Sequence, residues 1–424
     1  MKKYIYFVLS AIVAMPALLD GYLRSDGNLV LWYLLGLALL AVWGSYPRYK
    51  SRWLTWAMYG LTALVVCNAV VSAGWGLAYG EPSPTLEPNL NARMRFTPRA
   101  LPPGMVGDQV ITTNERGHRT NVPIDYGHKE PGTLRVVSIG ASTTEEATLD
   151  DHKIWTNLMA EELAKATGKR VEVINTALSG VRAEQSYHAL IESEALEPDA
   201  ITFILGINDW NHAILIEDWS PFYRFAFGFK AMGFGNSLLF RGLRELKQDL
   251  MAWLRPKGRA GEQLYINDGE YVAGYTNALE RPIKRDFRPA TVDPEYAKWV
   301  GRIMDECQRK KLPCVFGDQP TAYSPAIAPE LRPLLWMTPP FAGYTLSLDD
   351  LTRLAGLYND WIAKEAGSHG ELFCPLASNM PPTTEVFIDD CHYNEEGTRR
   401  IARMMTACVL ERMEKTGAIG HLAH

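Results

Sequence analysis

Apolar runs divide the chain into two unequal parts. Before Gly80 the sequence is dominated by Leu, Ala, Val, Trp and Tyr, and after it charged residues and prolines become frequent. The early part contains three apolar stretches that show no amphipathic stripe: Tyr4–Leu19, Leu29–Gly44 and Trp53–Tyr79. Stretches of this kind are typical of transmembrane helices rather than of buried helices in a soluble protein. We therefore expect residues 1–80 to form a membrane anchor in contact with the lipid bilayer.

Positive charges set the expected orientation of this anchor. Lys2 and Lys3 precede the first span, and three basic residues lie between positions 48 and 52, whereas the loop 20–27 carries one Arg against two Asp. Because positive loops stay in the cytoplasm, everything after Gly80 is expected on the extracytoplasmic side of the cell (inner) membrane. An alternative interpretation of the first span is a cleaved signal peptide, which leaves the same orientation.

A proline-rich segment follows the anchor. Six prolines lie between Glu81 and Gly104, and this stretch is predicted to be an extended stalk without regular structure. Together with a short lead-in it makes up residues 81–130. The remainder, 131–424, is expected to form the main domain.

In the main domain, short apolar strands alternate with amphipathic helices. The expected strands are Leu134–Ile139, Val171–Ile174, Ala200–Leu205, Pro313–Phe316 and Glu371–Phe373. The expected helices cover residues 154–163, 183–194, 296–310, 351–366 and 395–415. This alternation predicts an α/β fold with a doubly wound, mostly parallel, five-stranded sheet, flavodoxin-like in type, whose ligands sit beyond the carboxyl ends of the strands.

The interval of about 210–290 breaks the alternation. It has aromatic residues and glycines in Trp219–Phe240 and a helical pattern in Leu243–Leu254. Two interpretations remain open: an insertion that forms a lid or a membrane-facing patch, and an insertion packed against the core without a functional role.

Charge and cysteine content argue against several classes of function. A formal net charge of −5 and a pI near 6.0 provide no basic surface, so nucleic-acid binding is not expected. No cysteine pair has the spacing of a metal or redox site, and neither a metal nor a cofactor is expected. In an oxidising compartment, Cys374 with Cys391 and Cys307 with Cys314 are disulfide candidates, the former pair being favoured; buried free thiols are the alternative.

Polar groups suited to acyl transfer follow the strands. Ser142 comes directly after the first strand, where a strand-to-helix turn would present its hydroxyl as a nucleophile once a base takes the proton. His392 is the candidate base, and Asp389, one helical turn earlier, can orient the imidazole. Asp390 is an alternative partner for His392, and a helix N-cap is an alternative role for Ser142.

Two further segments offer hydrogen-bond donors. Gly180, after the second strand, can give an unhindered backbone N–H, and Asn208, after the third, can give a side-chain NH2 to the oxyanion that forms on attack. A turn-forming role is the alternative for Asn208.

Along the chain these residues lie in four segments, which carry Ser142, then Gly180, then Asn208, and last Asp389 with His392. In that order the four segments resemble the sequence blocks of the SGNH, or GDSL-like, hydrolase family. The resemblance covers the chain from Leu134 to the C-terminus and implies an SGNH hydrolase-like fold. It places the family's nucleophile on Ser142, its Asp-x-x-His pair on Asp389 and His392, and its oxyanion-hole residues on Gly180 and Asn208.

Two positions depart from the family pattern. Ala141 stands where the family commonly has Asp, and Ala177 where it commonly has Gly. Neither removes a group that attacks, transfers a proton or stabilises the oxyanion. The lead-in Thr113–Arg119 also resembles one found in membrane-anchored members of the family.

Three functions follow from this pattern. The first is a membrane-tethered extracytoplasmic serine esterase that removes an acyl group, such as O-acetyl, from a cell-envelope glycan by a Ser-His-Asp mechanism. The second is an O-acyltransferase that modifies an exported polysaccharide with the same triad. The third, a non-catalytic glycan-binding protein, would be expected to have lost Ser142 or His392, and both are present.

Overall fold

The computed structural model describes residues 85–217, 262–269, 271, 281–284, 287–339 and 342–419. These residues belong to one compact unit, made of 83–217 and 258–424. The three expected spans before Gly80, the expected helix Leu243–Leu254 and most of the expected insertion lie outside the described residues. Within the described residues, no helix is both long and apolar enough to cross a membrane.

A six-stranded sheet forms the centre of this unit. Its strand order is β3-β5-β4-β6-β8-β9. The strands are β3 (Arg119–Thr120), β4 (Leu134–Gly140), β5 (Val171–Asn175), β6 (Ala200–Ile204), β8 (Cys314–Gly317) and β9 (Leu372–Cys374). Five of them are parallel, in the order expected for a doubly wound sheet, and the α/β prediction is confirmed. The sheet is nevertheless mixed and has one more strand than predicted, because β3 pairs antiparallel with β5.

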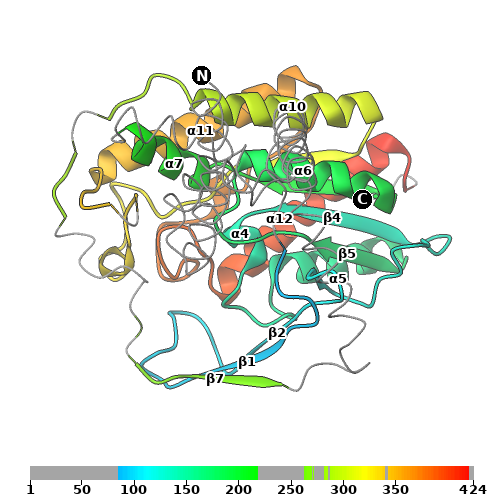
Figure 1. The fold of residues 1–424 in the computed structure, drawn as a ribbon, viewed down its shortest axis with the longest axis horizontal. Coiled ribbons are helices and arrows are strands. Elements are labelled where there is room, and N and C mark those ends of the chain that lie inside the picture. The colour runs from blue at the N-terminus through cyan, green and yellow to red at the C-terminus, as the bar shows by residue number, and fades with distance from the viewer. Residues whose placement is uncertain are drawn as a thin grey trace, which may run out of the picture. The chain divides into compact units, whose positions relative to one another are not determined.

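Helices cover both faces of the sheet (Figure 1). They are α4 (Ser142–Glu145), α5 (Trp155–Thr167), α6 (Ala183–Ser193), α7 (Ile207–Glu217), α10 (Pro294–Lys310), α11 (Leu348–Ser368) and α12 (Glu395–Thr416). The 3₁₀ turns are Glu194–Leu196, Arg332–Leu334 and Ala377–Asn379. Helices α5 and α12 pack together on one side, and α6 and α10 on the other. The strands β4, β5 and β6 are accordingly buried along their whole length, which fits their mostly apolar sequences. The two charged residues among them, Arg135 and Glu172, form an ion pair.

Part of the predicted stalk is regular structure, so that prediction is wrong for Asn91–Phe96. These residues form β1, which pairs antiparallel with β2 (Gln109–Thr112) and parallel with β7 (Gln263–Asn267). The strand is compatible with the prolines because all six lie outside residues 91–96. β2 is tied to the segment before α5, since the N–H groups of Val110 and Thr112 donate to carboxylates at 150 and 151 over 2.9 and 2.8 Å.

Two disulfides brace the second half of the unit. Cys307 and Cys314 are bonded, with Cα atoms 6.2 Å apart, and join the end of α10 to β8. Cys374 is bonded to Cys408 on α12, with Cα atoms 5.9 Å apart. The expected Cys374–Cys391 pairing is therefore wrong. Among the described cysteines, Cys391 is the free one; it is buried, with its sulfur 3.8 Å from Nδ1 of His392.

Candidate active site

The turn after β4 presents Ser142. Gly140 allows a close approach here, because a Cβ at this position would lie 2.3 Å from Oγ1 of Thr144. The N–H groups of Thr144 and Glu145 both donate to the Ala141 carbonyl, over 2.9 and 2.8 Å, and close the turn into α4. Ser142 is half-buried, whereas the three residues after it in α4 are buried. The serine is therefore the most accessible residue of α4.

Asp389 and His392 form a hydrogen-bonded ion pair. Nδ1 of His392 lies 2.7 Å from Oδ2 of Asp389. The other carboxylate oxygen, Oδ1, accepts the backbone N–H groups of Cys391 and His392, each over 2.9 Å. The Asp389 side chain thus stabilises the loop that carries it and also fixes the orientation of the His392 imidazole.

The two members of this pair shift each other's pKa values. Burial favours the neutral form of Asp389, but the charge and hydrogen bond of His392 and two backbone donors outweigh it and lower the pKa below 3.8. Burial by itself lowers the pKa of His392, whereas the charge and hydrogen bond of Asp389 raise it well above 6.5. Because the His392 side chain is 30% exposed, water screens part of this attraction. The arrangement still favours a charged imidazolium beside a carboxylate.

The neighbouring acid, Asp390, has different partners. Its oxygens accept the N–H groups of Trp336 and Met337 over 2.6 and 3.0 Å. Burial, followed by the charge of Asp389, raises its pKa to about 8. Of the two carboxylates considered from the sequence, Asp389 is therefore the one that bonds to His392.

The turn that carries Ser142 lies near the segment that carries Asp389 and His392. Glu146, directly after α4, interacts electrostatically with His392, and its Oε2 accepts the Thr398 hydroxyl of α12 over 3.0 Å. Tyr393 is buried, and its pKa is raised well above 10, chiefly by burial, with contributions from Cys391 and Glu146. The structure thus brings the segments that carry the expected nucleophile and base into one region.

Gly180 lies in the loop between β5 and α6, and Asn208 in the first turn of α7. Gly180 has φ +81°, a left-handed conformation that favours glycine, while a Cβ there would meet no atom within 4 Å. The Asn208 side-chain nitrogen donates to the carbonyl of Val181 over 2.9 Å. The two expected oxyanion-hole residues are therefore linked through Val181, the neighbour of Gly180.

The side chains of Asn175 and Glu145 also hold the loop that carries Gly180. Oδ1 of Asn175 accepts the N–H of Ala177 over 3.0 Å. Oε2 of Glu145 accepts both the N–H and the hydroxyl of Ser179, the latter over 2.6 Å. In the sequence, Glu145 and Glu146 are marked only by their position three and four residues after Ser142. Ser179, in a loop 34 residues from Glu145, and Thr398, on α12, are partners that no local pattern reveals.

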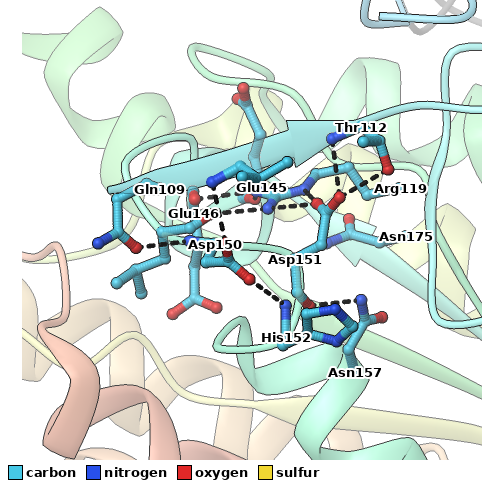
Figure 2. Close-up of polar contacts among 12 residues, drawn as sticks. Gln109, Thr112, Arg119, Glu145, Glu146, Asp150, Asp151, His152, Asn157 and Asn175 are labelled. Atoms are coloured by element: carbon cyan, nitrogen blue, oxygen red, sulfur yellow. Dashed lines mark hydrogen bonds and ion pairs between the residues drawn. The ribbon is translucent and has the colours of Figure 1, made fainter. Parts of the chain in front are cut away.

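Arg119, on β3, anchors the turn that follows Ser142 (Figure 2). It is 1% exposed, and Nη1 donates to the carbonyls of Glu145 and Glu146 over 2.7 and 2.9 Å. Nη2 donates to the carbonyl of Leu149 and, like Nε, to Oδ1 of Asp151. The sequence identified Arg119 only as part of a family-like lead-in. In the structure its guanidinium satisfies three carbonyls of the chain that follows Ser142.

Glu146 is the most strongly perturbed acid beside the turn. Its backbone is left-handed, with φ +50°, and its Oε2 accepts the N–H of Trp155 over 2.6 Å. Burial raises the pKa of Glu146 to about 8. The hydrogen bonds from Trp155 and Thr398 and the charge of Arg119 oppose this shift. A non-glycine residue held in this conformation is a local strain that the surrounding contacts must maintain.

Two described residues of the expected insertion lie next to the histidine segment. The hydroxyl of Tyr271 donates to the carbonyl of Ile388 over 2.9 Å. The guanidinium of Arg281 donates to several carbonyls between residues 336 and 342, including that of Trp336 over 2.6 Å. These contacts place Tyr271 beside the segment that carries His392 and Arg281 beside residues 336–342.

The segment 389–392 also contains three potential metal ligands. Ligand atoms of Asp389, Cys391 and His392 lie within 4.8 Å of one another. Nδ1 of His392 is, however, the atom that pairs with Asp389, so the hydrogen-bonded pair already accounts for this geometry.

Comparison with known proteins places the chain among acyl hydrolases. The model of the GDSL-like lipase/acylhydrolase family matches residues 138–400. A GDSL-like lipase from Bacteroides thetaiotaomicron is similar at 13% identity, over 65% of this chain and 88% of that one, with a TM-score of 0.34. An acetylxylan esterase from Geobacillus stearothermophilus is similar at 14% identity, over 65% and 94% of the chains, with a TM-score of 0.36. No curated protein matches the chain significantly.

Proposed function

This chain belongs to the GDSL-like lipase/acylhydrolase family, and from that premise we propose that Ser142, His392 and Asp389 cleave an acyl ester. The observation that carries the proposal is the Asp389–His392 pair, in which the carboxylate fixes the imidazole over 2.7 Å. A serine hydroxyl becomes a nucleophile when a neighbouring imidazole takes its proton, and an oriented imidazole is the group that this reaction needs.

In the proposed reaction, Nε2 of His392 accepts the Ser142 proton, because Nδ1 is held by Asp389. The serine oxygen bonds to the ester carbonyl carbon, and the tetrahedral intermediate then expels the alcohol, which receives the proton from His392. Water, deprotonated by the same imidazole, attacks the acyl carbon of the acyl-enzyme. The second tetrahedral intermediate breaks its bond to the serine oxygen, which takes the proton back from His392, and the acid leaves. Asp389 stabilises the imidazolium that forms in each half of the reaction.

Two other segments provide the proposed hydrogen-bond donors to the oxyanion. We propose that the N–H of Gly180 and the side chain of Asn208 stabilise it. An amide nitrogen carries two hydrogens, so the bond from Asn208 to Val181 leaves a second one for the substrate. The departures at Ala141 and Ala177 remove none of these groups.

The proposed substrate is an O-acyl group, such as O-acetyl, on a glycan of the cell envelope. Support comes from the sequence before Gly80, whose three apolar spans and positive loops predict a tether with the catalytic unit outside the cytoplasm. The same triad would perform acyl transfer if a sugar hydroxyl, rather than water, attacked the acyl-enzyme. Water exclusion around the acyl group decides between these outcomes.

The test uses the full-length protein purified in detergent and a short-chain acyl ester, with and without an acetyl-accepting oligosaccharide. Release of free acid, absent from Ser142→Ala, is the expected result. Acylated oligosaccharide as the main product would assign the chain to transfer. Equal rates for the wild type and Ser142→Ala would reject both.

A further inference from the structure

We propose that Glu145 is a positioning residue for the oxyanion hole, acting through Ser179 on the loop that carries Gly180. This inference rests on the proposed function, because it assigns a role in that reaction to a side chain that touches neither the nucleophile nor the base. The argument starts from the way in which the loop is held.

The ends of the loop between β5 and α6 are fixed independently of Glu145. At its start, the N–H of Thr176 donates to the Ser138 carbonyl of β4 over 3.0 Å. At its end, the Val181 carbonyl accepts from Asn208 and the N–H of Ala183 donates to the carboxylate of Asp209. These bonds leave the exposed residues 179 and 180 between two anchored ends.

Glu145 holds the middle of that loop. Its Oε2 accepts both the N–H and the hydroxyl of Ser179, the residue directly before Gly180. Hydrogen bonds to a carboxylate are stronger than neutral ones, and two donors on one oxygen fix direction as well as distance. The peptide plane that contains the N–H of Gly180 begins at Ser179, so its orientation depends on this contact.

The carboxylate is itself rigidly placed. Glu145 is 5% exposed, its N–H donates to Ala141 over 2.8 Å, and its carbonyl accepts from Arg119 over 2.7 Å. Arg119 lies on β3, and Figure 2 shows its side chain beside Glu145 and Glu146. Since Glu145 and Ser142 share α4, the contact to Ser179 couples the position of the Gly180 N–H to that of the nucleophile.

This coupling affects the rate because a donor stabilises the oxyanion only within hydrogen-bonding distance of it. A donor must lie about 2.7 to 3.1 Å from the position of the oxyanion, and a shift of about 1 Å in a positioned group costs on the order of a hundredfold in rate. Loss of the Glu145 contact would therefore slow the chemical step while leaving ground-state binding nearly unchanged.

The experiment measures kcat, KM and inhibition by a short-chain trifluoromethyl ketone, which forms a tetrahedral adduct with serine, on the full-length chain in detergent. For Glu145→Ala we expect kcat to fall about tenfold to a hundredfold, KM to stay within about twofold and inhibitor affinity to fall with kcat. Glu145→Gln keeps an acceptor oxygen and should recover most of the rate. The pH profile set by His392 should not move.

Two further variants separate positioning from general destabilisation. Glu172→Gln alters an equally buried acid, paired with Arg135 at the opposite end of β5, and should lower stability without lowering kcat. Ser179→Ala should lower kcat less than Glu145→Ala and should have no further effect in the Glu145→Ala background. If Glu145→Ala does not fold, Ser179→Ala, which removes the hydroxyl that donates to Glu145, tests the same contact, and a wild-type kcat for it would overturn the inference.

A Glu145→Ala protein that folds and keeps wild-type kcat and inhibitor affinity would overturn the inference. So would a loss of kcat that Glu172→Gln reproduces. Ser142→Ala is measured alongside: if it remains active, the proposed function itself fails, whereas an inactive Ser142→Ala with a fully active Glu145→Ala rejects only the role of Glu145.

Discussion

At the scale of single residues, the two oxygens of Asp389 have separate tasks. Oδ1 binds the backbone of the loop and Oδ2 binds the imidazole of His392. The adjacent Asp390 is turned toward the N–H groups of Trp336 and Met337. The sequence alone left both acids as candidates, because the distinction depends on which way a short loop turns.

Replacing Asp389 by Asn should change both the rate and its pH dependence. Only neutral His392 can accept the serine proton, so wild-type kcat/KM should rise with pH through a pKa above 6.5. Asp389→Asn removes the charge that raises this pKa, so the inflection should move to lower pH while kcat falls by about 10² to 10⁴. An exposed control, Asp349→Asn, should leave the profile unchanged. An identical profile for Asp389→Asn would contradict the assigned pair.

Asn208 should contribute to the rate through its N–H groups. Asn208→Asp has nearly the same shape but offers no donor, and we expect turnover to fall by about 10² to 10³, as for Asn208→Ala. Steady-state kinetics with a short-chain ester provide the measurement, with circular dichroism to confirm folding. A normal kcat for Asn208→Asp would exclude the oxyanion role.

At the scale of elements, the predictable parts are those in which local sequence determines the outcome. β4, β5 and β6 were predicted because each is a short run of mostly apolar residues, as expected for a strand that is buried on both faces. β1 was missed because the prolines on either side of it predicted an extended stalk. One of its two partners, β7, also lies about 170 positions away, so that pairing leaves no local signature in the sequence.

The candidate site was likewise predictable only in the parts that local sequence determines. The positions of Ser142, Gly180 and Asn208 at strand ends follow from the order of strands and helices. Cys408 was not considered as the partner of Cys374 because only the packing of α12 beside β9 brings it there. Contacts between side chains of distant loops, such as Glu145 with Ser179, depend on tertiary structure that the sequence pattern does not encode.

The anchoring of α4 by β3 predicts a large effect for Arg119→Met. Removing the guanidinium leaves the buried carbonyls of Glu145, Glu146 and Leu149 without this donor and Asp151 without its ion pair. We expect a loss of about 3 to 5 kcal/mol in the free energy of unfolding. Denaturant titration measures it. Arg170→Met, which removes a cation that is 56% exposed, should cost less than about 1 kcal/mol, and equal losses for the two variants would contradict this account.

At the scale of the whole molecule, the sequence before Gly80 predicts a tether that places the catalytic unit outside the cytoplasm. A phosphatase reporter that is active only outside the cytoplasm should work when fused after Gly80 and fail when fused after Arg52. A fluorescent reporter that matures only in the cytoplasm should give the opposite pattern. The reverse result at both positions would invert the proposed topology.

The most direct test of the central claim is covalent labelling of the intact protein with a fluorophosphonate, followed by peptide mass spectrometry. An activated serine reacts with this reagent, so we expect one adduct on Ser142, no adduct in Ser142→Ala, and labelling slowed by at least about 10² in His392→Ala. Ester hydrolysis should disappear in the same variants. A Ser142→Ala protein that hydrolyses the ester at the wild-type rate would contradict the assignment of Ser142 as the nucleophile.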